Sequence, residues 1–279
     1  TDDRPARKQV ANSAECLAQS QVYGGLSLRE CEWKMTCLAL GSSLVGCYGQ
    51  VHRDHCRSAD MPRVAIVIGA TGLVGRLLLK ELSASQQYAQ IIAVTRRYDL
   101  PNLPNIEPLM VSDFAQLSSQ IAALDLTDAD AFSCLGTTLR QAGSKARFKE
   151  IDYQYNLDFA QACKQAGVRH FFLLSATGAS ANSAVFYNRI KGELERDVIA
   201  LGFHYVSIFQ PSLLLGEHAD PRPAEVMGQR LFSAAKAIIP KTFAYRPIEA
   251  VRVACAMRQV AIETANSGTV LAKPVTVYS

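Results

Sequence analysis

The sequence predicts an α/β fold with a doubly wound parallel sheet and helices on both of its faces. Short β-branched apolar runs alternate with helical patterns from about residue 61 onward. These runs are continuous rather than alternating, which is typical of strands that are buried on both faces. A glycine-rich stretch joins the first run to the first helical pattern. Alternation at this spacing indicates parallel strands linked by right-handed crossovers.

The first strand and helix are the best defined. Val64–Ile68 is a short apolar run, and 73–82 carries apolar residues on one helical face. Between them, Gly69, Gly72 and Gly75 have the spacing G-x-x-G-x-x-G, one residue longer than the usual dinucleotide fingerprint. In a Rossmann turn these glycines permit a tight turn, a close approach to the diphosphate, and helix–strand packing. A tight turn without any ligand is the alternative.

The second strand carries a cofactor signal at its end. The run 91–95 is followed directly by Arg96 and Arg97. An NAD enzyme keeps an acidic residue here for the ribose 2′-hydroxyl, whereas guanidinium groups pair with a 2′-phosphate. The sequence therefore favours NADP(H) over NAD(H), although two solvated surface arginines would give the same pattern. Asp99 is expected in the loop beyond the strand.

The remaining elements follow in the same alternation. The third strand ends near Asp113, and the fourth leads into Gly136, Thr137 and Thr138, small residues at a strand end that would line the cofactor crevice. The other predicted elements are helices over 115–124, 148–168 and 187–201, a fifth strand over 170–175 and a sixth over 205–211.

Candidate catalytic groups follow the fifth strand. Ser175 stands at the strand end, and Tyr187 and Lys191 are spaced i, i+4 in a helical segment, so their side chains share one face. A nearby ammonium favours the ionised form of a phenol, which suits acid/base work. Ser175 can donate a hydrogen bond to a substrate oxygen. A chance Tyr-x-x-x-Lys pair in an ordinary helix is the alternative.

Several of these stretches resemble one family. "GATGLVG", "SCLGTTLRQAGS", "DYQYNLDFAQACKQAGVRHFFLLSATGA", "YNRIKGELE" and "FQPSLLLG" make residues 61–279 similar to the atypical short-chain dehydrogenases/reductases, and most of all to the Tat-interacting (TIP30-like) oxidoreductases and their small bacterial relatives. The resemblance does not extend to the preceding residues.

The resemblance implies roles for individual residues. Ser175, Tyr187 and Lys191 would be the catalytic trio, with Lys191 also holding the nicotinamide ribose. The cofactor would be NADP(H), with Arg96 on its 2′-phosphate and Asp113 beside the adenine. The diphosphate and ribose would lie against Gly69, Thr71, Gly72, Leu73, Val74, Gly75, Gly136, Thr137 and Thr138.

Two positions depart from the family pattern, and the substrate region is hard to read. Ala176 replaces a frequent second serine, so Thr177 is a candidate to share the role of Ser175, and Gln210 replaces a common arginine. Segment 216–240, a Pro-rich loop and an amphipathic helix, is expected to cap the site. The resemblance implies hydride transfer between NADP(H) and a small carbonyl or alcohol. The alternatives are an NADP(H)-sensing regulator of a protein partner and a nucleotide-sugar epimerase- or dehydratase-like enzyme.

The first 60 residues differ from the rest of the chain. They contain five of the eight cysteines, and the strand–helix alternation starts only after Met61, a natural start for the domain. We expect 1–60 to be a disordered or non-native extension, and 61–279 to be a single domain whose part from about 211 onward caps the substrate.

We expect no metal site in this extension, and a zinc site is the alternative. Cys47, His52, His55 and Cys56 cluster loosely, but their spacing matches no zinc pattern. The sparse cysteines of the remaining chain are typical of a reducing compartment. We therefore expect a cytoplasmic protein.

Composition and charge are those of a globular protein. Hydrophobic residues make up 49% of the chain and charged residues 19%, which is enough for a sizeable core. The net charge is +4, and no Lys/Arg run indicates a nucleic-acid surface. No stretch approaches the roughly 18 apolar residues of a spanning helix. We expect a monomer or homodimer that acts on a small molecule, without nucleic acid or membrane partners.

Overall fold

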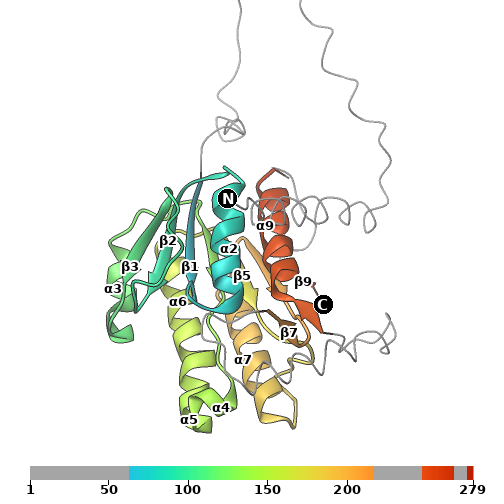
Figure 1. Cartoon of the computed structure of the whole chain (residues 1–279). Helices are drawn as coiled ribbons and strands as arrows, with labels where there is room; N and C mark the ends of the chain where they lie inside the picture. Colours follow the sequence, from blue (N-terminus) through green and yellow to red (C-terminus); the bar gives the residue numbers. More distant parts are fainter. Residues whose placement is uncertain (1–62, 217–246, 267–274, 279) are drawn as a thin grey trace, which may run out of the picture. The chain divides into compact units, whose positions relative to one another are not determined.

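The computed structural model describes residues 63–216, 247–266 and 275–278 (Figure 1). The chain divides into two units, Thr1–Ala59 and Asp60–Ser279, and the described residues all belong to the second. The expected extension over 1–60, with its cysteine and histidine cluster, lies outside the described residues. So does nearly all of the expected capping segment 216–240.

Strands and helices alternate through the described part of the chain. The strands are β1 (Arg63–Ile68), β2 (Tyr88–Thr95), β3 (Ile106–Met110), β4 (Asp130–Ser133), β5 (His170–Leu174), β6 (Tyr205–Phe209), β7 (Leu214–Leu215), β8 (Ile248–Glu249) and β9 (Val275–Tyr278). The helices are α2 (Leu73–Ala84), α3 (Leu117–Ala122), α4 (Leu139–Ala142), α5 (Lys145–Lys149), α6 (Tyr155–Gln165), α7 (Phe186–Ala200) and α9 (Ala250–Asn266), with a short 3-10 turn at Phe114–Gln116.

A parallel sheet forms the centre of this unit. Its strand order is β3-β2-β1-β4-β5-β6-β9, and each neighbouring pair is parallel. In β1, Ile66 pairs with Ile92 of β2 on one side and with Ala131 of β4 on the other. The order reverses between β1 and β4, and such a reversal opens a crevice at the carboxyl ends of the strands. The predicted doubly wound fold is confirmed.

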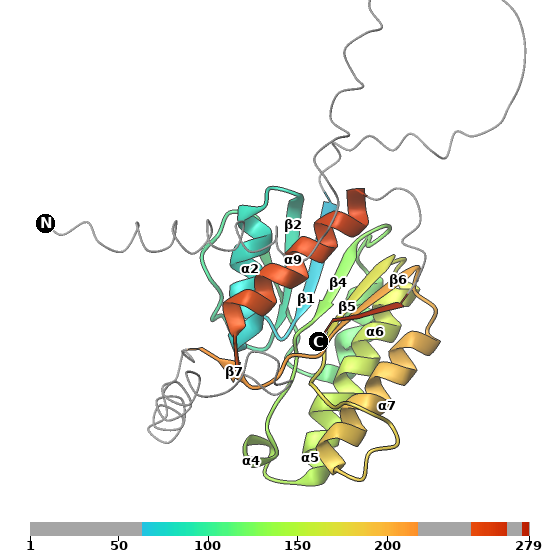
Figure 2. The ribbon, with the colours of Figure 1, turned by 90° about the vertical axis from the view of Figure 1, so that its right-hand side faces the viewer.

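Helices cover both faces of the sheet. Figure 2 shows α2 and α9 on one face and α6 and α7 on the other. Each layer buries its own apolar cluster against the sheet, because buried strands present apolar residues to both faces. The α2/α9 side contains Val67, Leu78, Phe172 and Met257, and the α6/α7 side contains Ile66, Phe159, Phe171 and Leu194. Among the described helices, none combines the length and apolar character needed to cross a bilayer.

Three segments differ from the expectation. The helix expected over 148–168 is interrupted by a π-helical turn at Glu150–Gln154. The fourth strand ends at Ser133, and residues 134–138 follow it as a loop. Helix α9 packs in the core and strand β9 extends the sheet beside β6, although the chain from about 211 onward was assigned to a substrate cap. The apolar face of α9 explains this difference, because Val253, Ala254 and Met257 are buried against α2.

Candidate functional site

The glycine turn between β1 and α2 has the geometry that its spacing predicts. Gly69 has φ +76°, and a Cβ there would lie 2.4 Å from the carbonyl carbon of Cys134. A Cβ on Gly75 would lie 2.1 Å from the Gly69 oxygen. Gly69 therefore permits the turn and its approach to β4, and Gly75 permits α2 to pack on it. These are two of the three roles expected for the glycines.

The start of α2 leaves donors free for an anion. Gly72 is its N-cap and supplies no side-chain cap. The first N–H groups of a helix have no partner within the helix, and the helix dipole adds positive potential there. Thr71 and Leu73 flank this position and are half-buried, whereas Val74 is buried beneath them. The turn fits a diphosphate group, as it does in nucleotide-binding βα units.

A cavity of about 190 Å³ lies beside this turn. Arg96 and Arg97 line it at the end of β2, together with Thr71. Thr95 shapes the strand end: its hydroxyl donates to the Arg97 carbonyl (2.8 Å) and accepts from the Arg97 N–H (3.1 Å). The other lining residues are Ile68, Gly69, Val94, Thr95, Val111, Phe114 and Leu135. This mix of apolar walls and two guanidinium groups fits an adenosine with an anionic substituent.

Two carboxylates near this cavity already have partners within the protein. Asp99 forms an ion pair with Arg76 of α2, whose Nε also donates to the Thr71 carbonyl. Asp113 accepts a hydrogen bond from the Ala115 N–H (3.0 Å) and so caps the short turn that follows it. Asp113 is not among the residues that line the cavity, where its neighbour Phe114 lies instead. The expectation that Asp113 lies by the adenine stays a prediction.

The loop after β4 is fixed by a buried carboxylate. Asp152, in the π-helical turn, accepts a hydrogen bond from the Thr137 N–H (2.8 Å) and forms an ion pair with Lys191 Nζ (2.8 Å). Thr138 caps α4. The structure therefore brings the predicted Gly136–Thr138 segment and the predicted Lys191 to the same point.

Lys191 is a buried cation surrounded by acidic groups. Its side chain is 5% exposed. Burial alone lowers the pKa of this ammonium, but Asp152, Tyr187 and Glu195 together raise it above its ordinary value. Lys191 therefore carries its charge inside the site. Tyr187 lies one turn earlier on the same face of α7, with its ring 5.5 Å from the Phe148 ring.

Ser175 is held by groups that the sequence did not suggest. Its N–H donates to the Phe209 carbonyl (2.7 Å), and its hydroxyl donates to the carboxylate of Glu195. Gln210 Nε2 donates to both oxygens of that carboxylate, at 3.0 Å each. Burial raises the pKa of Glu195, although Ser175, Gln210 and Lys191 oppose this rise. Thr177 donates to the Gln210 carbonyl (2.7 Å) rather than sharing the role of Ser175.

Asp152 and Glu195 were missed, for different reasons. Glu195 follows Lys191 by four residues, just as Lys191 follows Tyr187, so the i, i+4 rule could have placed it on the catalytic face. Asp152 gave no such signal, because its position depends on a π-helical turn that no residue pattern predicted. Such turns occur frequently at functional sites.

The described residues thus combine a glycine turn at a helix N-terminus, a cavity lined by two arginines and a Tyr–Lys pair at the carboxyl end of one sheet. A family model described as NAD(P)H-binding matches residues 69–223, more than half of the chain. The chain belongs to this NAD(P)H-binding family. The expected resemblance to atypical short-chain dehydrogenases/reductases is confirmed.

Curated relatives of this family member come from fungi and an animal. It is 36% identical over 169 residues to Protein FMP52, mitochondrial, of Lodderomyces elongisporus, covering 58% of this chain and 71% of that protein. It is 40% identical over 158 residues to Protein FMP52-1, mitochondrial, of Scheffersomyces stipitis, covering 55% and 68%. It is 34% identical over 171 residues to Protein HTATIP2 of Rattus norvegicus, covering 60% and 69%.

Solved structures with a similar fold include NAD complexes. MoeE5 in complex with UDP-glucuronic acid and NAD has a TM-score of 0.55 at 18% identity, covering 76% of this chain and 74% of that one. WbmF of Bordetella bronchiseptica in complex with NAD+ has a TM-score of 0.56 at 17% identity, covering 78% and 72%. At this identity the likeness supports the fold alone.

The relatives correct one expectation. The prediction of a cytoplasmic protein is contradicted, because the FMP52 relatives are named mitochondrial proteins. The cysteine argument failed because a low cysteine content indicates a reducing compartment without distinguishing one such compartment from another.

Proposed function

We propose that this protein is an NADP(H)-dependent oxidoreductase that interconverts a small carbonyl compound and its alcohol. The observation that carries the proposal is the Lys191 ammonium, buried against Asp152 on the helix face that also bears Tyr187. A family member that only bound a nucleotide would not need the Tyr187 phenol beside the buried Lys191 ammonium. The fold by itself does not fix a function, so the proposal depends on these side chains.

Binding is assigned to the turn and to the strand ends. The N-terminus of α2 would hold the diphosphate, and Arg96 and Arg97 the 2′-phosphate. Asp99 is a poor candidate for a ribose 2′-hydroxyl, because it is paired with Arg76. This supports NADP(H) over NAD(H). Lys191, tied to the loop at Gly136–Thr138 through Asp152, would hold the nicotinamide ribose.

The chemistry requires one proton per turnover. The bound nicotinamide supplies or accepts the hydride. In the reductive direction the carbonyl oxygen gains a proton, and Tyr187 donates it. Lys191 stabilises the phenolate that this leaves, because an opposite charge favours the ionised form. Ser175 stabilises the negative charge that develops on the substrate oxygen.

The test is the variant Tyr187→Phe, assayed by NADPH consumption with a panel of aldehydes and ketones. It removes the hydroxyl and keeps the ring packed beside Phe148. We expect NADPH affinity and melting temperature to stay near those of the parent, and turnover to fall by about 10²–10⁴-fold, the range for a general acid. Tyr153→Phe is the control, because it removes a hydroxyl that donates to Asp197 and that has no role in the proposed chemistry.

Two results would count against the proposal. Full turnover in Tyr187→Phe would mean that the tyrosine is structural. NADPH binding without turnover of any compound in the panel, combined with capture of a protein partner that depends on NADPH, would favour the regulator alternative.

A further inference from the structure

Glu195 and Ser175 form a hydrogen-bonded cluster with Gln210 at the carboxyl ends of β5 and β6. The carboxylate of Glu195 accepts from the Ser175 hydroxyl and, at 3.0 Å on each oxygen, from Gln210 Nε2. The Thr177 hydroxyl also holds Gln210 in place, because it donates to the main-chain carbonyl of Gln210 at 2.7 Å. Two separate segments, one after β5 and one after β6, thus orient this single carboxylate of α7.

The direction of the Ser175 bond conflicts with the role proposed for that residue. A serine hydroxyl carries one hydrogen, and a carboxylate can only accept. With its hydrogen committed to Glu195, Ser175 presents lone pairs to the crevice. It cannot then donate to a substrate oxygen, which is what stabilising a developing negative charge requires.

We propose that the protonation state of Glu195 decides whether Ser175 can donate to the substrate. When Glu195 takes up a proton from solvent, its carboxylic acid donates to Ser175 Oγ, and the serine hydrogen turns toward the substrate oxygen. When Glu195 is ionised, the hydrogen turns back. Glu195 is thus a positioning residue for Ser175. This inference rests on the proposed function, in which Ser175 contacts the substrate.

The surroundings of Glu195 favour proton uptake. Burial has the largest effect on the pKa of Glu195 and raises it, whereas the hydrogen bonds of the uncharged Ser175 and Gln210 lower it, as does Lys191, the charged group that faces Glu195 among the described residues. The Lys191 ammonium is paired with Asp152 at 2.8 Å, and this pairing limits how far Lys191 lowers the pKa of Glu195. Gln210 stands where an arginine would keep Glu195 ionised.

The test measures hydrogen bonding without hydride transfer. Isobutyramide has a carbonyl oxygen that accepts hydrogen bonds, but it resists reduction, so its affinity for the protein–NADPH complex can be followed against pH by calorimetry. We expect the affinity of the parent protein to fall by about tenfold as pH rises through the titration of Glu195, because one hydrogen bond is lost. Isobutyramide binding does not depend on turnover, so the result of the Tyr187→Phe assay does not affect this measurement.

Four variants separate this idea from a structural role. Glu195→Gln should bind isobutyramide tightly at every pH, since its amide N–H can donate to Ser175 permanently. Ser175→Ala should bind weakly at every pH. Gln210→Arg should move the pH transition lower by about 1–3 pH units, because a cation favours the carboxylate. Glu193→Gln, on the same helix, should leave the transition where it is.

A transition that persists in Glu195→Gln would overturn the proposal. So would an affinity in the parent protein that does not change with pH, or an absence of isobutyramide binding at every pH, because the proposal requires a free donor at low pH.

Discussion

At the scale of single residues, the site is organised by buried charges that are paired across distant segments. Lys191 and Asp152 are 5% and 1% exposed, and their ion pair joins α7 to the π-helical turn. Asp152 also holds the backbone of Thr137. One carboxylate therefore fixes both the cation beside Tyr187 and the loop that borders the cofactor crevice.

Asp152→Asn tests this pairing. The amide keeps the shape of the side chain but leaves the Lys191 ammonium buried without a counter-charge. Breaking a buried pair in this way costs about 3–5 kcal/mol, so we expect the melting temperature to fall by roughly 6–20 °C for a domain of this size. NADPH affinity should fall as well. Asp158→Asn is the matched control, because Asp158 accepts from Gln154 on the exposed side of the same segment. Equal losses in the two variants would contradict the role of Asp152.

The arginines after β2 give a second residue-level prediction. Arg96 and Arg97 are exposed and line the cavity beside Thr71. Arg96→Ala should reduce the preference for NADPH over NADH by about 1–3 kcal/mol, the scale of a charge-assisted contact. Fluorescence titration of both cofactors measures this gap. Arg196→Ala removes an exposed arginine paired with Asp197 on α7 and should leave the gap unchanged. Equal affinity of the parent protein for the two cofactors would refute the NADP(H) assignment.

The sequence predicted those site residues whose spacing carries information. Tyr187 and Lys191 are one helical turn apart, and Ser175 follows an apolar strand, so local patterns were enough to find them. Asp152 reaches Lys191 only through the tertiary fold, and the Glu195 carboxylate that accepts the Ser175 hydrogen bond is also bound by Gln210, a residue of a different strand end. Local spacing contains no information about contacts of that kind.

At the scale of elements, the β1–α2 turn is where the glycine spacing in the sequence predicts the backbone geometry most directly. The glycine spacing exists because two backbone segments touch: α2 begins so close to Gly69 that a side chain at Gly75 would meet its oxygen at 2.1 Å. Periodicity was less informative elsewhere. It predicted one helix over 148–168 and missed the π-helical turn within it, because no residue in this segment marks the change of winding.

Gly75→Ala and Gly72→Ala should separate the packing role of this turn from its binding role. The methyl group added by Gly75→Ala would force backbone apart, and we expect a loss of stability of about 1–3 kcal/mol or more, together with weaker NADPH binding. At Gly72 the same oxygen would lie 3.2 Å away, a much milder contact. That variant should keep most of its stability and lose affinity, because its added methyl group lies where the diphosphate approaches. Thermal melts and NADPH titrations compare the two, and an unchanged melting temperature in Gly75→Ala would contradict the packing role.

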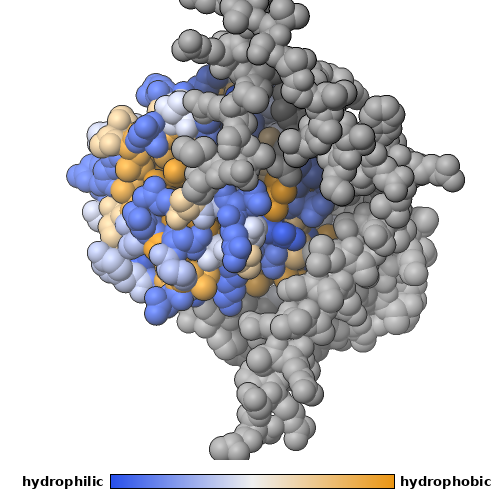
Figure 3. Space-filling model, turned by 90° about the horizontal axis from the view of Figure 1, so that it is seen from above, coloured by the Kyte–Doolittle hydropathy of each residue, from blue (hydrophilic) through white to orange (hydrophobic). Residues whose placement is uncertain are grey.

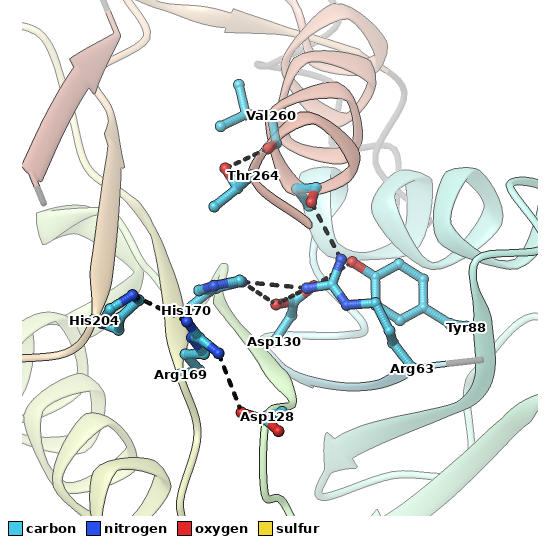
Figure 4. A network of polar contacts seen from close by, with 10 residues as sticks. Arg63, Tyr88, Asp128, Asp130, Arg169, His170, His204, Val260 and Thr264 are labelled. Carbon is cyan, nitrogen blue, oxygen red and sulfur yellow. Dashed lines mark hydrogen bonds and ion pairs between the residues drawn. The ribbon is translucent and has the colours of Figure 1, made fainter. Parts of the chain in front are cut away.

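At the scale of the whole unit, a second polar cluster lies at the amino-terminal end of the sheet, away from the crevice. Asp130, the first residue of β4, is fully buried and pairs with Arg63 of β1 and with His170 of β5 at 2.9 Å (Figure 4). Tyr88 of β2 donates to the same carboxylate, and burial together with Asp130 raises the pKa of its phenol well above the ordinary value. Seen from this end, the described surface mixes hydrophilic and hydrophobic side chains (Figure 3).

This cluster ties four neighbouring strands together at the end opposite to the binding site. Arg63 also reaches the Ala261 carbonyl of α9 at 3.3 Å, which links the sheet to one helical layer. His170 belongs to this cluster through its contact with Asp130. The residues of the proposed site thus lie at the carboxyl ends of the strands, and this cluster, which links the strands, lies at their amino ends.

Asp130→Asn should affect stability and leave binding intact. The amide cannot balance the Arg63 guanidinium, which is only 17% exposed, so we expect a loss of about 3–5 kcal/mol in the free energy of unfolding. Asp128→Asn is the control: it pairs with Arg169 at 3.7 Å, with both side chains at least 35% exposed, and should cost less than about 1 kcal/mol. Urea unfolding measures both. NADPH affinity of the folded Asp130→Asn protein should match that of the parent, because Asp130 begins the strand whose other end leads to Gly136. A marked loss of NADPH affinity in Asp130→Asn protein that is fully folded would contradict this expectation, and would mean that the two ends of the sheet are coupled.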